Sequence, residues 1–138
     1  MSASTKLSTA VKALCYLSES SPNGKNSQEI SSEIGINASK LRKILSMLVK
    51  SDIVGSNIGT SGGFVLKKKH DEIHLQEIYC AIEDRKAFYL NVNKEHAHKS
   101  QRSERLNQFF LSLFADIQIE IEDKMKTITL KQIIDNTK

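Results

Sequence analysis

A cluster of cationic and hydroxyl side chains lies between residues 35 and 50, a stretch without any acidic residue. Lysine and arginine bind phosphate oxygens through charge-assisted hydrogen bonds, and arginine and serine also donate to the edges of bases. The residues of this kind that one helical face would present are Ser39, Lys40, Arg42 and Lys43. They predict binding to a polyanion, with double-stranded DNA favoured. The alternative is an ordinary amphipathic helix with a solvated basic face.

The cysteine and histidine residues do not have the spacing of a metal site, and no group of residues has the pattern of a catalytic site. Cys15 and Cys80 are too few and too far apart for a zinc site, and His96 and His98 have no cysteine nearby. We therefore expect no metal. Cys80 is a candidate redox-active thiol, and an inert cysteine is the alternative because no CxxC partner occurs. No nucleophile, base and orienting group form a catalytic set, so the sequence does not predict an enzyme.

A glycine-rich loop, GTSGG at residues 59–63, separates two short β-prone runs. Two such runs joined by a flexible tip predict a β-hairpin over about residues 55–66. A hairpin that directly follows a DNA-recognition helix is called a wing. Its backbone N–H groups can approach a phosphate or the minor groove. Lys67, Lys68 and Lys69 follow the second run and add positive charge. The loop lacks the glycine–lysine spacing of a nucleotide-binding P-loop.

Two short helices joined by a tight turn must position the basic cluster. Asn26 and Glu29 predict a reciprocal cap for the first helix, which Gly35 can end. Asn37 can then cap a second helix over residues 38–50. In that helix the apolar residues fall on one side and the cationic residues on the other. This pattern predicts a helix-turn-helix in which residues 38–50 form the recognition helix.

Apolar residues at helical spacing predict further helices. One covers residues 5–18 beneath the helix-turn-helix, one covers 73–83 and packs against the wing, and the longest covers 101–126. Residues 127–134 are expected to form a short helix that returns to the core. The longest helix would extend past a small winged domain, so we expect part of its apolar stripe to be buried against a second copy. The dimerisation residues are Leu106, Phe110, Leu113, Ile117 and Ile121.

Composition limits the class of protein. The chain has 138 residues and a net charge of +4. Residues 1–70 carry ten basic and four acidic residues, whereas residues 71–138 carry ten basic and twelve acidic residues. The basic first half suits a polyanion and the second half suits packing or self-association. Because no apolar run approaches the length of a membrane span and the N-terminus lacks a signal peptide's apolar core, we expect a cytoplasmic protein.

Five blocks of the sequence occur together in a recognisable order, and together they resemble one family. They are STKLSTAVKALCYLSES, QEISSEIGINASKLRKILSMLVKSDIV, GTSGGFVL, IHLQEIYCAIE and TITLKQII. The chain resembles the Rrf-two family of bacterial winged-helix regulators, whose members include an iron-sulfur cluster regulator, a nitric-oxide-sensing repressor and a cysteine-metabolism repressor. The resemblance implies a homodimer held by the long helix that binds a palindromic operator and usually represses transcription.

The sequence departs from the family pattern at two places. Iron-sulfur members carry three cysteines between the fourth helix and the dimerisation helix, whereas residues 84–105 contain none. The sequence therefore predicts no cluster and no other cofactor, and it resembles a cluster-free, YwnA-like branch. The family often has an arginine before the first wing glycine, where this chain has Ile58. Asn57 and the glycine-loop backbone are left for that role.

These observations predict a mainly α protein with a β-hairpin wing. Residues 1–83 form the winged helix-turn-helix domain, and residues 84–138 hold a linker, the dimerisation helix and the return helix. The predicted function is a homodimeric, sequence-specific regulator of transcription, with repression favoured. The alternative is a dimeric protein-interaction module that uses the winged domain as a scaffold. The candidate DNA-binding residues are Thr5, Lys6, Ser27, Ser39, Lys40, Arg42, Lys43, Asn57, Gly59, Thr60, Ser61 and Gly62. The effector and the operator sequence stay open.

Overall fold

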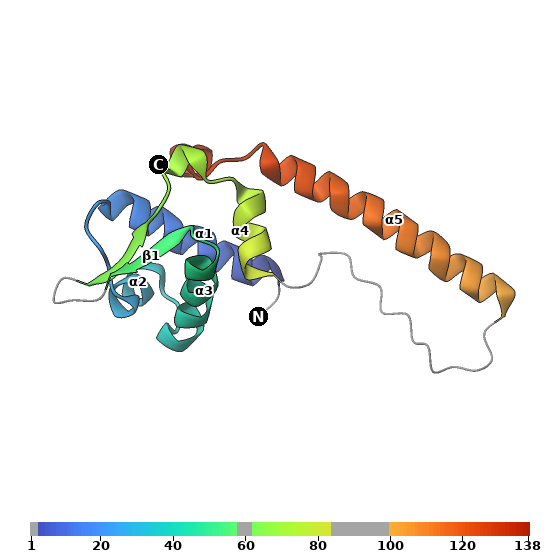
Figure 1. Ribbon diagram of the computed structural model, residues 1–138, viewed down its shortest axis with the longest axis horizontal. Coiled ribbons are helices and arrows are strands. Elements are labelled where there is room, and N and C mark those ends of the chain that lie inside the picture. The colour runs from blue at the N-terminus through green and yellow to red at the C-terminus, as the bar shows by residue number, and fades with distance from the viewer. Residues whose placement is uncertain (1–2, 58–61, 84–99) are drawn as a thin grey trace.

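The computed structural model describes residues 3–57, 62–83 and 100–138 (Figure 1). Gly59, Thr60, Ser61, His96, His98 and the aromatic segment 88–92 lie outside the described residues. In chain order the elements are α1 (Ala3–Ser20), α2 (Ser27–Ile34), α3 (Ala38–Lys50), β1 (Val54–Asn57), β2 (Gly63–Leu66), a 3-10 helix η1 (His70–Glu72), α4 (Leu75–Ile82), α5 (Gln101–Lys126) and α6 (Leu130–Asp135). The predicted fold class is confirmed.

The two helices of the helix-turn-helix begin and end at the predicted residues. The Asn26 side chain accepts a hydrogen bond from the Glu29 N–H at 2.8 Å, and the Glu29 carboxylate accepts one from the Asn26 N–H at 3.4 Å. Gly35 ends α2 in the left-handed conformation, with φ 71°. The Asn37 side chain then accepts hydrogen bonds from N–H groups in the first turn of α3. These local caps fix where α2 ends and where α3 starts.

The apolar face of α3 forms the centre of the core. It packs against α1, α2, α4 and β1. Burial of each leucine or isoleucine side chain of this face stabilises the fold by about 1.5–3 kcal/mol. Rotating this helix about its axis would expose these side chains and is therefore unfavourable. The buried residues of α3 are Leu41, Ile44, Leu45 and Leu48. Their burial leaves the cationic face of the helix in solvent.

The end of α3 directs the chain into the wing. The Leu48 carbonyl accepts a hydrogen bond from the Ile53 N–H at 3.1 Å, and the Val49 carbonyl accepts one from the Asp52 N–H at 3.1 Å. Asp52 has a positive φ of 60°, which makes this turn a Schellman motif without glycine. The Asp52 carboxylate lies 3.2 Å from the Lys67 ammonium. The wing therefore leaves the recognition helix at a fixed angle.

The wing is the predicted two-stranded antiparallel hairpin, with pairs from Val54–Leu66 to Asn57–Gly63. The loop between α1 and α2 also pairs with the wing. The Lys25 N–H donates to the Phe64 carbonyl at 3.1 Å, and the Phe64 N–H donates to the Lys25 carbonyl at 2.7 Å. At Gly63 a Cβ would lie 2.7 Å from the Lys25 carbonyl carbon. A glycine is therefore required where these backbones meet.

Gly63→Ala is expected to lower the free energy of unfolding by about 1–3 kcal/mol, because the added methyl group would force the Lys25 backbone away from the wing. Chemical denaturation followed by circular dichroism measures this. Gly24→Ala is the matched control, in the loop between α1 and α2 that pairs with β2, since its Cβ would meet the Val65 side chain at an ordinary 3.4 Å. Equal stability of the two variants would contradict the close approach at Gly63.

The sequence placed the fourth helix against the wing, and this expectation was wrong about its main neighbours. The principal contacts of α4 are with α1, α3 and α5. Its apolar residues Ile78, Tyr79 and Ile82 are buried there, because a helix with a wide apolar face covers more surface against other helices than against a two-stranded hairpin. The α4 helix therefore supports the recognition helix α3 directly.

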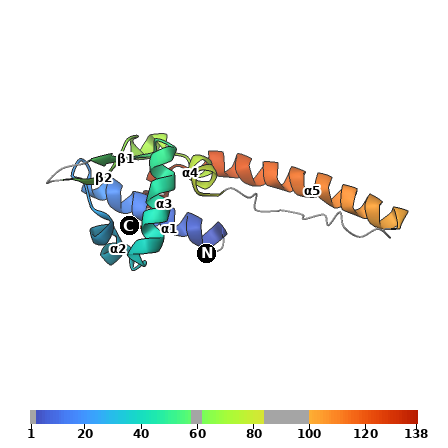
Figure 2. The same ribbon diagram turned by 60° about the horizontal axis from the view of Figure 1, so that its bottom comes forward.

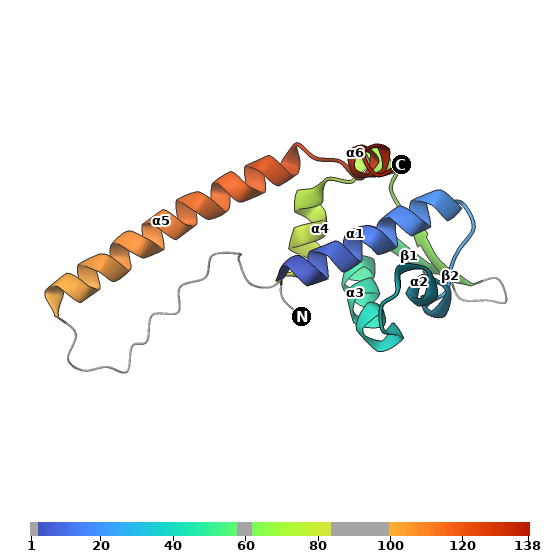
Figure 3. The ribbon, with the colours of Figure 1, turned by 180° about the vertical axis from the view of Figure 1, so that it is seen from behind.

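The C-terminal helix α6 returns to the core as expected. The Leu75 N–H donates to the Ile128 carbonyl at 2.8 Å, and the Leu130 N–H donates to the Ile73 carbonyl at 2.8 Å. Leu130 and Ile134 are buried among the core residues. Figure 3 shows α6 on the side of the body opposite α3.

The long helix α5 extends away from the winged body (Figures 1 and 3). None of the described core residues lies on it. The large apolar side chains that are exposed among the described residues all lie on α5, and they are Leu106, Phe109, Phe110, Leu111, Leu113 and Ile119. Such an apolar surface is uncommon on a monomer.

Among the described helices, none is both long enough and apolar enough to span a bilayer.

Candidate nucleic-acid interface

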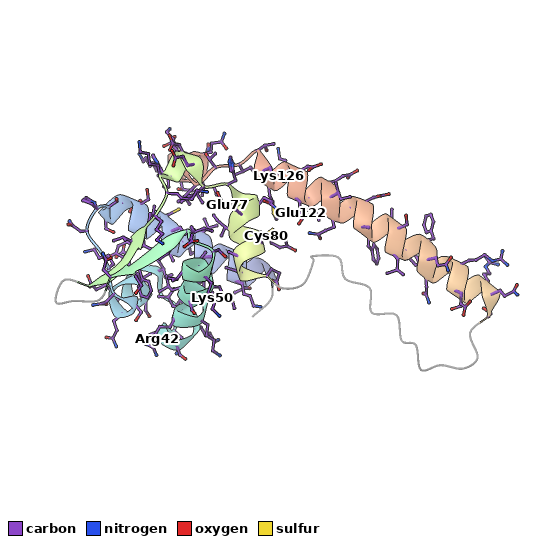
Figure 4. The ribbon with its side chains drawn as sticks, viewed as in Figure 1. Arg42, Lys50, Glu77, Cys80, Glu122 and Lys126 are labelled. Carbon is purple, nitrogen blue, oxygen red and sulfur yellow. The ribbon has the colours of Figure 1, made fainter. Side chains whose placement is uncertain are left out.

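The outward face of α3 carries the predicted binding residues. Ser39, Lys40, Arg42 and Lys43 are all exposed. The three cations form no ion pair with the described carboxylates, so their charge is available to a ligand. Figure 2 shows α3 in front of α1, and Figure 4 shows Arg42 on the outer side of the helix. The geometry suits insertion of α3 into a groove lined by phosphates.

A cleft joins α3 to the start of α1. It has a volume of about 290 Å³, and the described residues that line it are Lys6, Lys40, Lys43, Ile44 and Met47. The two apolar residues form part of its wall, and the three lysines bring positive charge to it. Three ammonium groups around one concavity attract an anion, and a backbone phosphate fits this charge pattern. The structure thus brings together lysines from two elements 34 residues apart in sequence.

Thr5 and Lys6 lie within the first turns of α1 because that helix begins at Ala3, two residues before its predicted start. Thr5 is exposed and Lys6 is partly buried. The Lys6 ammonium lies 3.8 Å from a Glu83 carboxylate oxygen. Sequence reasoning missed Glu83, since nothing in the spacing along the chain relates the end of α4 to the start of α1.

Three of the remaining predicted residues belong to the part of the chain that the structure describes. Ser27 is the first residue of α2 and is half-buried, and Asn57 is exposed at the tip end of β1. Gly62 lies at the other side of the wing tip and is partly buried. Figure 2 shows α3 between the wing and the N-terminal end of α1. A surface of this arrangement can contact successive stretches of one duplex.

The lysines after β2 supply less free charge than the sequence indicates. The Lys67 ammonium lies 3.2 Å from Asp52, and the Lys68 ammonium lies 2.8 Å from Glu77. Ion pairs of this kind neutralise two of the three charges assigned to the wing exit. The positive charge of the candidate interface is therefore concentrated on α3 and the start of α1.

The two cysteines lie outside this face. Burial raises the pKa of Cys15, and the Glu19 carboxylate raises it further. Burial and the Glu122 carboxylate raise the pKa of Cys80, while Lys126 lowers it. Figure 4 shows Cys80 on α4, facing the end of α5 that carries Glu122 and Lys126. A raised pKa leaves less reactive thiolate at neutral pH, so the redox role of Cys80 stays a hypothesis.

The chain is similar to known proteins in sequence and in fold. The family model Rrf2, described as an iron-dependent transcriptional regulator, matches residues 3–136. The chain belongs to the Rrf2 family. Rrf2 proteins regulate transcription and bind DNA, so this chain is a DNA-binding transcriptional regulator by family, and the prediction that it is not an enzyme is confirmed.

Individual relatives agree with the Rrf2 assignment. YwnA of Bacillus subtilis (strain 168), an inferred HTH-type transcriptional regulator, is 26% identical over 125 residues, which cover 90% of this chain and 92% of YwnA. YwgB of the same strain, also an inferred HTH-type regulator, is 36% identical over 63 residues, which cover 46% of this chain but only 40% of YwgB. A crystal structure of an inferred transcriptional regulator from Lactobacillus plantarum shares the fold, with a TM-score of 0.80 at 20% identity over 93% of this chain and 86% of that one.

The residues of this Rrf2 chain do not fit a cysteine-ligated iron-sulfur cluster. The sequence holds two cysteines in all, one on α1 and one on α4. The protein ligands of such a cluster are mainly thiolates, and two cysteines are fewer than a cluster usually takes, whereas the pKa of each thiol here is also raised. In the described part of the chain, no three side chains of histidine, cysteine, aspartate or glutamate gather as a metal site. The prediction that no cluster binds therefore rests on the cysteine content.

Proposed function

We propose that the protein is a homodimeric repressor that binds a palindromic operator in the bacterial cytoplasm. The α3 helices of two subunits enter successive major grooves on one side of the duplex. The observation that carries this proposal is the exposed cationic face of α3, whose lysines and arginine have no carboxylate partner among the described residues. Repression follows where the operator overlaps a promoter.

The contacts divide by chemistry. Ser39 and Arg42 donate to base edges, while Lys40 and Lys43 bind phosphates. Ser27 and Thr5 supply hydroxyl groups to the backbone, and Lys6 joins the phosphate contacts through the cleft. In the wing, Asn57 and the backbone of Gly59, Thr60, Ser61 and Gly62 approach the minor groove.

Dimerisation through α5 supplies the two-fold symmetry that a palindrome needs. At 1.5 Å per residue, its 26 residues extend about 39 Å. Leu106, Phe110 and Leu113 are exposed, and Ile117 and Ile121 are partly buried. Burial of this stripe against a second copy removes the apolar surface from water. In this proposal residues 1–83 bind DNA, and residues 84–138 provide the dimer helix and the return helix.

Fluorescence anisotropy with a labelled duplex from the region upstream of the protein's own gene tests the proposal. We expect binding that survives unlabelled competitor DNA and whose affinity falls steeply as the salt concentration rises, because phosphate contacts release counterions. Binding without sequence preference would contradict the specific regulator. No binding at all would favour the alternative, a protein-interaction dimer.

The same titration with and without a mild oxidant addresses Cys80. A loss of binding on oxidation that Cys80→Ser prevents would make this thiol the switch. Binding that is unchanged by oxidant would agree with the raised pKa and remove Cys80 from the mechanism.

A further inference from the structure

Glu83 carries a buried carboxylate that is paired with Lys6, one of the lysines that line the cleft. It caps the C-terminal end of α4, and only 7% of its side chain is exposed. Its Oε1 atom lies 3.8 Å from the Lys6 ammonium, and its Oε2 atom is buried and finds no hydrogen-bond partner among the described residues. A carboxylate taken out of water needs compensation from a charge. Lys6 provides that charge, although 3.8 Å is longer than a hydrogen bond.

Lys6 can therefore interact with two anions, the Glu83 carboxylate and an anion that enters the cleft. It lines the cleft together with Lys40 and Lys43. Of these three lysines, Lys6 alone forms an ion pair with a described carboxylate. Its side chain is 28% exposed, so the ammonium can still reach an anion that enters from solvent. At 3.8 Å the pair lacks a direct hydrogen bond, so Lys6 can turn toward a phosphate, while the need of the buried Glu83 carboxylate for a compensating charge opposes that movement.

We propose that Glu83 sets the affinity of the cleft for a DNA backbone phosphate by competing with that phosphate for Lys6. This inference rests on the proposed DNA-binding function. In the free protein the Glu83 charge holds Lys6 and reduces the repulsion among the three lysines. When a phosphate enters, Lys6 shifts toward it, and the weakened contact between Lys6 and Glu83 opposes that shift. Glu83 thus acts through Lys6 and need not touch DNA.

Glu83→Gln tests this, because the amide keeps the size of the side chain and removes its charge. We expect DNA to bind about three- to tenfold more tightly, which is the size expected for one partly screened charge several ångströms away. The duplex from the upstream region and a scrambled duplex of equal length should gain equally, since a phosphate contact carries no sequence information. Anisotropy titrations with both duplexes measure the gain.

A double-mutant cycle with Lys6→Gln separates this role from a general charge effect. If Glu83 acts through Lys6, Glu83→Gln should have no effect on affinity in the Lys6→Gln background. Glu19→Gln is the charge-matched control, since Glu19 is exposed and lies about 20 Å from Lys6 at 1.5 Å per residue along α1. A gain as large in Glu19→Gln, a gain that persists without Lys6, or a loss of affinity in Glu83→Gln would each overturn the proposal.

Two further readouts keep the test decisive. If Glu83→Gln fails to unfold cooperatively, Lys6→Gln alone should weaken binding less than Lys43→Gln does, because Glu83 already offsets part of the Lys6 charge. Equal losses would overturn the role of Glu83. Failure of the wild-type protein to bind either duplex would instead refute the proposed function, so the two failures are distinguishable.

Discussion

Replacing Phe110 and Leu113 with aspartate is expected to leave the chain monomeric and to weaken its binding to DNA by about 100-fold or more. Both side chains are exposed on α5, at 40% and 37%. A carboxylate at each site would have to be desolvated in a dimer, which opposes association. A monomer contacts one half-site, so it loses the second binding event. Light scattering with size-exclusion chromatography measures the mass, and anisotropy measures the affinity.

The opposite face of α5 supplies the control for this experiment. At 100° per residue, Gln108 and Ser112 lie on the side of the helix away from Phe110. Gln108→Asp with Ser112→Asp adds the same charge and should leave the dimer intact. Because no described core residue lies on α5, the winged body of both variants should stay folded. A Phe110→Asp/Leu113→Asp protein that remains dimeric would refute this interface.

Replacing Arg42 and Lys43 with alanine is expected to weaken operator binding by about 100-fold or more, since base-contacting and phosphate-contacting cations each contribute about 1–3 kcal/mol. The plot of log affinity against log salt should also flatten, by about one unit for each phosphate that the protein no longer neutralises. Arg42 and Lys43 are exposed and make no ion pair with the described residues, so stability should not change. Anisotropy titrations at several salt concentrations give both quantities.

Two lysines at the other side of the body separate a specific role of α3 from net charge. Lys131 on α6 and Lys138 at the C-terminus are exposed, and Figure 3 shows α6 and the C-terminal end on the side of the body opposite α3. Lys131→Ala with Lys138→Ala removes the same charge and should lower affinity only slightly. If this control reduces affinity and salt dependence as much as Arg42→Ala with Lys43→Ala, α3 is not the recognition helix.

The sequence predicted the local structure well because the signals that start and stop helices act over a few residues. The Asn26 cap, the left-handed Gly35 and the Asn37 cap all occur where the pattern required them. The α5 helix has the predicted bounds for the same reason, since its apolar residues repeat at helical spacing over 26 residues. The exposed face of α3 followed from its buried stripe.

Contacts between distant elements could not be predicted in this way. Lys25 pairs with the wing and Glu83 lies close to Lys6. The sequence around Lys25 and Glu83 contains no pattern that predicts these contacts. The main neighbours of α4 were also missed, because an apolar stripe shows that a face is buried but not which surface covers it. The sequence likewise does not show that two of the lysines after β2 form ion pairs, Lys67 with Asp52 and Lys68 with Glu77.

The sequence by itself determined a helix-turn-helix with a cationic outer face, a glycine-tipped hairpin, a long apolar helix and a cysteine content too low for a cluster. These features depend on residue type and on spacing within one element. Only the tertiary structure decided which charges stay available, because an ion pair forms wherever folding brings two side chains together. It gathered Lys6, Lys40 and Lys43 around one cleft, paired Glu83 with Lys6, and left the apolar residues of α5 in solvent.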